Sequence, residues 1–154
     1  MTLENLLAIH RLQPFDVTPG GLQRLLASTE RNLADARLPE LSADNRFDTA
    51  YKAIMQCAMI GLWAKGYRTS TSQPGHHQTA LQTLPKTMGV AQDIVIILDA
   101  LRKQRNHNDY EGDPITDAAV SECLAQAKAL LAHTRQWLHA HRPDLLINLP
   151  IKEQ

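Results

Sequence analysis

The residues best suited to chemistry lie in the segment Arg105–Gly112, which follows an apolar stretch of the chain. Its sequence, RNHNDYEG, supplies a guanidinium, two amides, an imidazole, two carboxylates and a phenol. One guanidinium group can donate hydrogen bonds to two phosphate oxygens at once, and an amide can hydrogen-bond to a ribose hydroxyl or a further phosphate oxygen. Arg105, Asn106 and the preceding Arg102 therefore predict a phosphate-binding site.

The arrangement of these side chains depends on a helix that the sequence predicts over 90–109. At about 100° per residue, its apolar face is formed by Ile94, Ile97, Leu98 and Leu101. Arg105 continues this face, so we expect its guanidinium at the mouth of a helix bundle or at a subunit interface. Asp109 follows one turn later on the same face, and Tyr110 follows Asn106 on the adjoining side. His107 is rotated by about 200° from Arg105 and faces away from it.

A purely structural role for Arg105 is the alternative interpretation. An arginine on a core-facing stripe is also satisfied by an ion pair with Asp109 or with a carboxylate on another helix. In that case it stabilises the fold or the register of a dimer.

Two adjacent histidines, His76 and His77, open a further predicted helix. Neighbouring helical positions point about 100° apart, and no histidine or carboxylate follows His77 at the i+4 position, which is Leu81. We therefore expect no metal site here. Two interpretations remain: a helix cap or a bond to a neighbouring helix, and a contribution to an active cleft.

The composition restricts the class of protein. The 154 residues include 16 Lys+Arg and 16 Asp+Glu, giving a formal net charge of zero, so any nucleic-acid site must be a local basic patch. No stretch reaches the roughly 18 apolar residues of a membrane helix, and the N-terminus lacks the features of a signal peptide. We expect a cytoplasmic protein with no membrane association and no cofactor.

Apolar periodicity predicts an all-α fold. No segment alternates long enough to predict a strand. The expected helices, read from periodicity, caps and Gly or Pro stops, span about 3–12, 19–38, 44–65, 76–84, 90–109 and 113–141. The stretch 67–75 is the most loop-like and is the best candidate for a mobile segment.

The expected architecture is a single helical domain over 1–154, arranged as an antiparallel four- to five-helix bundle. An N-terminal helix and linker occupy 1–17, the core bundle occupies 18–142, and a tail occupies 143–154. The helix over 44–65 should form the centre of the core. We expect the tail to pack on a partner or to be disordered.

Three segments, in this order, resemble the HEPN domain family: AYKAIMQCAMIGLWAKGYR at 50–68, GHHQTALQTL at 75–84 and LRKQRNHNDYEG at 101–112. Members of this family are small helical bundles with an arginine–asparagine and tyrosine signature near the end of a late helix. The resemblance extends over about 22–137. It implies a homodimer in which two copies of the motif helix line one cleft.

The resemblance also implies a function. Many HEPN proteins are metal-independent RNA endonucleases, often toxins paired with a nucleotidyltransferase-type antitoxin. Their motif is an arginine, a polar residue, several further residues and a histidine, which helps the ribose 2′-hydroxyl to attack. Here Arg105-Asn106 matches its beginning, but Tyr110 stands where the histidine is expected. Arg102 and His107 have the right spacing, but Lys103 replaces the polar neighbour.

Two functions are therefore expected from the sequence. In the first, a dimeric HEPN-like protein cleaves RNA, with Arg105 and Arg102 on the phosphate, Asn106 orienting it, and His107 or Tyr110 transferring the proton. In the second, a non-catalytic HEPN-like module binds nucleotide, RNA or a protein partner.

Overall fold

A computed structural model describes residues 1–147 of the chain. Its elements, in order, are α1 (Leu3–Ala8), β1 (Leu12–Pro14), α2 (Pro19–Ala36), α3 (Ala43–Ala64), β2 (Tyr67–Thr69), α4 (His76–Gln82), α5 (Leu84–Thr87), α6 (Gln92–Glu111), α7 (Asp117–His141) and the 3-10 helix η1 (Pro143–Leu146). The protein is thus mostly helical, as the periodicity predicts.

The long helices begin where polar side chains cap them. Thr18 accepts a hydrogen bond from the backbone amide of Gly21 at the start of α2, and Pro19 follows as the first helical residue. Ser42 caps α3 and Thr116 caps α7 in the same way. These caps set the starts of the helices close to the predicted positions.

A small sheet accompanies the helices that the sequence predicts. β1 and β2 pair antiparallel, with Leu12 opposite Thr69 and Pro14 opposite Tyr67. Each strand has three residues, too short for an alternating pattern to be visible. The first helix consequently ends at Ala8 rather than near Leu12, because the chain turns at His10, whose φ is 64°.

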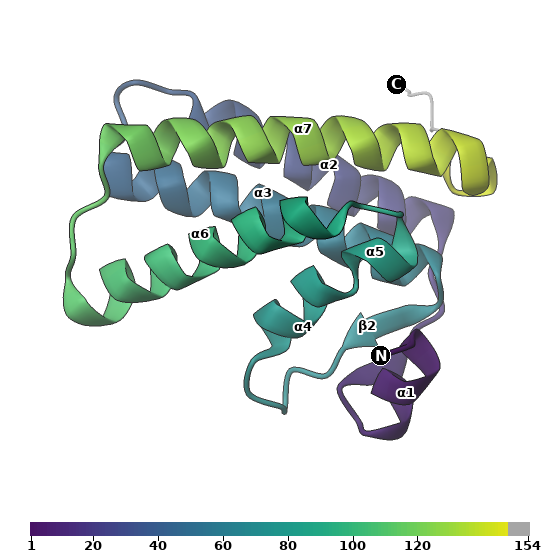
Figure 1. The fold of residues 1–154 in the computed structure, drawn as a ribbon. Coiled ribbons are helices and arrows are strands. Elements are labelled where there is room, and N and C mark those ends of the chain that lie inside the picture. Colours follow the sequence, from purple (N-terminus) through teal and green to yellow (C-terminus); the bar gives the residue numbers. More distant parts are fainter. Residues whose placement is uncertain (148–154) are drawn as a thin grey trace.

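The long helices pack side by side, with consecutive members running in opposite directions (Figure 1). α3 lies between α2 and α7 and also contacts α4, α5 and α6. It is buried on nearly every side, through thirteen residues that include Phe47, Ala50, Ile54, Ala58 and Leu62. This confirms the prediction that it forms the centre of the core.

Helix α6 is the least embedded of the long helices. Its buried residues are Val95, Leu98 and Leu101, all in its first three turns. Its C-terminal part extends away from α7, at the lower left of Figure 1, and connects to α7 by a wide loop. The polar segment Arg105–Gly112 therefore lies at an open edge of the bundle.

The described part of the tail packs on its own bundle. Leu145 is buried with Leu22, Ile60 and Leu138, and the Gln23 side chain donates to the Leu145 carbonyl at 3.0 Å. The predicted disorder of the tail is thus wrong for 143–147, while 148–154 lie outside the described residues. Within residues 1–147, no helix is long and apolar enough to cross a membrane.

Candidate functional site

A cavity of about 500 Å³ brings together side chains of α2, α3, α4 and α6. Its polar lining comes from Asp48, Tyr51, Lys52, Gln56, His77 and Arg105, and its apolar lining from Leu25, Met55 and Met59. Two residues that the sequence singles out, His77 and Arg105, therefore share one cavity. Its volume is in the range typical of small-molecule sites.

Arg105 is held by three groups at the edge of this cavity. Its Nε lies 2.7 Å from Oδ1 of Asp48, and its Nη1 lies 3.7 Å from Oδ2 of Asp109. Its guanidinium carbon also lies 5.2 Å from the centre of the Tyr51 ring. Burial lowers the pKa of Arg105, but the Asp48 hydrogen bond and the nearby carboxylates outweigh it and raise the pKa overall. The ion pairs expected under the structural interpretation are thus present, and the guanidinium is charged.

Tyr51 connects Arg105 to His77. The Tyr51 hydroxyl oxygen lies 3.3 Å from Nδ1 of His77. Burial raises the pKa of Tyr51 to about 12, so the phenol is protonated at neutral pH. Burial, together with His76, Arg105 and Arg102, lowers the pKa of His77. His77 is therefore a neutral imidazole at neutral pH, and in the tautomer protonated at Nε2 its Nδ1 accepts the hydrogen bond from the Tyr51 hydroxyl.

The adjacent histidines have different positions. His77 contacts Tyr51 on α3, whereas His76 lies edge-on to His77 with ring centres 4.7 Å apart. The N-cap of α4 is Gly75, with no side-chain cap hydrogen bond. His77 therefore bonds to a neighbouring helix and does not cap its own helix.

Arg102 and Asn106 do not line this cavity. Arg102 donates from Nε to Asp99 at 2.7 Å, and its side chain is largely buried. Asn106 is half-buried. The phosphate-binding group predicted from the helical wheel is therefore divided, with Arg105 in the cavity and Arg102 one turn earlier along α6.

His107 and Tyr110 lie on the outward side of α6. The His107 Nδ1 is 2.8 Å from Oε2 of Glu111, and Tyr110 is 85% exposed. His107, Glu111 and Asp113 bring three potential metal-ligating atoms within 4.8 Å of one another. Sequence reasoning missed this group, although the i,i+4 spacing of His107 and Glu111 is a signal for it.

Sequence reasoning also missed Asp48 and Tyr51. Both lie on α3, less than one turn apart, beside the exposed Lys52. The available signal was a cluster of polar side chains in a helix whose following turns are almost wholly apolar. Such a cluster marks the face at which a core helix meets a cavity or solvent.

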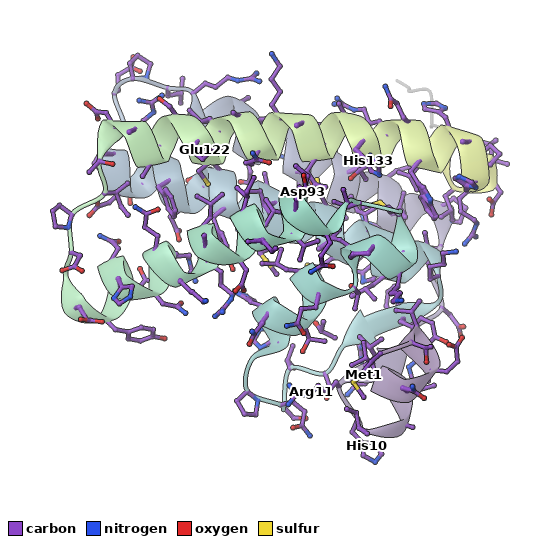
Figure 2. All side chains as sticks on the ribbon, viewed as in Figure 1. Met1, His10, Arg11, Asp93, Glu122 and His133 are labelled. Carbon is purple, nitrogen blue, oxygen red and sulfur yellow. The ribbon has the colours of Figure 1, made fainter. Side chains whose placement is uncertain are left out.

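A second cavity, of about 350 Å³, lies between the start of α6 and α7. Figure 2 labels His133 on α7 and Asp93 near the start of α6 in this region. The His133 Nε2 lies 2.7 Å from the Met88 carbonyl oxygen and donates a hydrogen bond to it. The other lining residues are Gly89, Val90, Ala91, Ile94, Gln126, Ala129 and Leu130. Because the His133 imidazole already forms this hydrogen bond, the second cavity has fewer polar groups available for binding or catalysis than the first.

The chain matches no family model, no curated protein and no solved structure in the comparisons with known proteins. Its function therefore has to be inferred from the geometry of the first cavity, which we call the Arg105 cavity.

Proposed function

We propose that this HEPN-like protein is a metal-independent RNA endonuclease that binds a phosphodiester at the Arg105 cavity. The observation that supports it most directly is that Arg105 and His77, from helices far apart in the sequence, line this cavity with Tyr51 between them. One side chain is a permanent cation and the other a neutral imidazole. These are the groups that charge stabilisation and proton transfer at a phosphodiester require.

The proposed reaction uses the Tyr51–His77 contact as a proton path. The ribose 2′-hydroxyl passes its proton to Tyr51 as Tyr51 passes its own to Nδ1 of His77. The 2′-oxygen then bonds to phosphorus, the bond to the 5′-oxygen breaks, and the imidazolium returns the proton to the 5′-oxygen through the same hydroxyl. Arg105 stabilises the charge on the phosphate oxygens. The products are a 2′,3′-cyclic phosphate and a 5′-hydroxyl.

The proposal revises the proton-transfer roles expected from the sequence. His107 and Tyr110 lie outward on α6, and His107 is engaged by Glu111, so His77 takes the proton. Asn106 extends the binding surface along α6, and Arg102 adds positive charge beside it while its side chain stays paired with Asp99.

A homodimer is part of the proposal, and the exposed stripe of α6 supports it. Ile96, Ala100, Lys103, His107 and Tyr110 recur at helical spacing and are all exposed. Ile96 and Tyr110 are 63% and 85% exposed, so this stripe presents one aliphatic and one aromatic side chain that a second copy could cover. Because this stripe faces away from Arg105, pairing of two α6 stripes leaves each Arg105 cavity open on the far side of its own helix. A toxin of this kind would act in the cytoplasm and be silenced by a nucleotidyltransferase-type antitoxin.

A non-catalytic HEPN-like module that binds RNA, nucleotide or a protein partner is the second candidate. The observation that favours it is the ion pair between Arg105 and Asp48 at 2.7 Å. A phosphate must displace the Asp48 carboxylate from Arg105 or share the guanidinium with it. This competition weakens the case for a preorganised catalytic site. In this candidate the Arg105 cavity recognises its ligand without cleaving it.

Incubation of structured RNA with tag-free protein in excess EDTA tests the proposal. The wild type should generate ends with a 2′,3′-cyclic phosphate. His77→Asn should reduce the rate by about 100-fold or more, the typical contribution of acid–base catalysis, with RNA affinity retained. Arg105→Ala should reduce both rate and affinity. The exposed Arg31 of α2 provides the matched control, and Arg31→Ala should cleave like wild type.

The possible outcomes separate the two candidates. RNA binding that depends on Arg105 without cleavage by the wild type establishes the binding module. Cleavage that is equally fast in wild type and both cavity variants overturns the nuclease proposal.

A further inference from the structure

The C-terminal end of α6 gathers one imidazole and two carboxylates from His107, Glu111 and Asp113. We propose that these three side chains bind a divalent transition-metal cation of the Zn²⁺ class. This site is separate from the Arg105 cavity, whose lining includes none of the three residues. The inference does not rest on the proposed nuclease activity, and it concerns residues other than His76 and His77, where the sequence predicts no metal site.

The distances suit a single small ion. The three ligating atoms lie within 4.8 Å of one another, and His107 Nδ1 and Glu111 Oε2 are 2.8 Å apart. Two ligands bound to one Zn²⁺ at about 2.0–2.2 Å lie roughly 3 to 4 Å apart. Small rotations of these exposed side chains therefore suffice to surround an ion, without movement of the backbone.

The backbone already holds the third ligand beside the first two. Gly112 ends α6 in the left-handed conformation, with φ of 75°, and so turns the chain back at Asp113. The Asn108 side chain then donates to the Asp113 carbonyl at 2.8 Å and to Asp44 at 3.1 Å. Asp44 also accepts from the backbone amide of Ile115 at 3.3 Å. The turn is thus anchored to the start of α3.

The local charge favours a cation independently of the ligand geometry. The last carbonyl groups of a helix carry a partial negative charge that attracts cations. The last turn of α6 contains no basic residue, while Glu111 and Asp113 add two negative charges beside it. Asp109 is paired with Arg105 instead. A divalent ion would neutralise both carboxylates and the helix end together.

The donor set indicates which cation binds. One imidazole nitrogen and two carboxylate oxygens suit Zn²⁺, Ni²⁺ or Co²⁺, whereas Mg²⁺ and Ca²⁺ prefer oxygen ligands alone. Three protein ligands leave one or more positions open to water or to an anion. Affinity should therefore increase from Mn²⁺ through Co²⁺ to Ni²⁺, and millimolar Mg²⁺ should not displace Zn²⁺.

Titration of tag-free, EDTA-dialysed full-length protein with Zn²⁺, followed by calorimetry, tests the site directly. We expect one ion per chain in wild type. His107→Gln, Glu111→Gln and Asp113→Asn should each weaken binding by at least about tenfold, because loss of even an outer-shell group costs 10- to 100-fold. Substitution of Co²⁺ should give a visible absorption spectrum that these variants lose.

Two controls keep the test specific. Asp109→Asn removes an acidic neighbour on the other side of α6, and His139→Gln removes an exposed histidine on α7; both should bind Zn²⁺ like wild type. Circular dichroism confirms that each variant is folded. Binding that is absent in wild type, or that is unaffected by the three ligand substitutions, overturns the proposal. RNA cleavage in EDTA is measured separately, so either proposal can fail without the other.

Discussion

The Tyr51 hydroxyl lies 3.3 Å from Nδ1 of His77 and connects the central helix α3 to the short helix α4. The same phenol ring lies under the Arg105 guanidinium from α6. Tyr51 is almost completely buried, so it fixes the positions of both polar groups relative to the core. The first two predictions concern this contact.

The stability of the protein should depend on the protonation of His77. Its pKa is lowered in the folded state by burial and by His76, Arg105 and Arg102, so below about pH 6.5 the unfolded chain binds more protons. The contribution of the neutral His77 side chain to folding stability is fully present above that pH and is lost as the pH decreases. Urea unfolding at pH 7.5 and 5.5 should show a smaller pH dependence for His77→Asn. An equal pH dependence in both proteins would rule this out.

Tyr51→Phe should separate proton transfer from packing. The ring under Arg105 is kept, and loss of the hydroxyl should cost about 1 kcal/mol of stability, as for one hydrogen bond. RNA cleavage should decrease by about tenfold or more with unchanged affinity, since the proton path to His77 is interrupted. Rates and RNA affinities are compared with those of Tyr67→Phe, the control in β2. A full rate in Tyr51→Phe would exclude the phenol from the path.

Asp48→Asn should strengthen RNA binding. Asp48 competes with phosphate for Arg105, and the pair is partly exposed, so its loss should cost less than about 1 kcal/mol of stability. We expect about three- to tenfold tighter binding in fluorescence anisotropy, with a steeper salt dependence. Asp35→Asn, on the exposed surface of α2, controls for the change in net charge. Equal tightening in the two variants would show that Arg105 is not involved.

Gly61→Ala should destabilise the core by about 1–2 kcal/mol. A Cβ atom at Gly61 would lie 2.8 Å from the Thr87 hydroxyl and 3.1 Å from Cγ of Met88, both on buried side chains. This overlap outweighs the gain in helix propensity. Gly20→Ala has only the Arg24 side chain at 3.4 Å and should be neutral or stabilising. Urea unfolding of both variants measures the difference, and unchanged stability of Gly61→Ala would contradict the packing argument.

Ile96→Glu should disrupt the proposed dimer. A charge at Ile96, the first apolar residue of the exposed α6 stripe, disfavours burial against a second copy. Light scattering at micromolar concentration should give a dimer mass for wild type and a monomer mass for this variant. Leu38→Glu, at the similarly exposed residue 38 after α2, should remain dimeric. A monomeric wild type would remove the homodimer from the proposed function.

The sequence by itself determined most of the helical architecture. Apolar spacing and local caps, such as Thr18 before Pro19, depend on residues three or four positions apart, which one helical turn brings together. The central position of α3 was also predictable, because apolar residues occupy nearly every face of this helix. The three-residue strands were not, since each lacks a visible pattern and forms only against the other.

The composition of the Arg105 cavity was decided by the tertiary structure alone. Helical geometry predicted that Arg105 continues a core face and that His107 turns away, but it could not identify the partners. Asp48 is 57 positions from Arg105, and Tyr51 is 26 positions from His77. Helix periodicity relates only residues within one helix, whereas the crossing of α3, α4 and α6 decides which side chains meet.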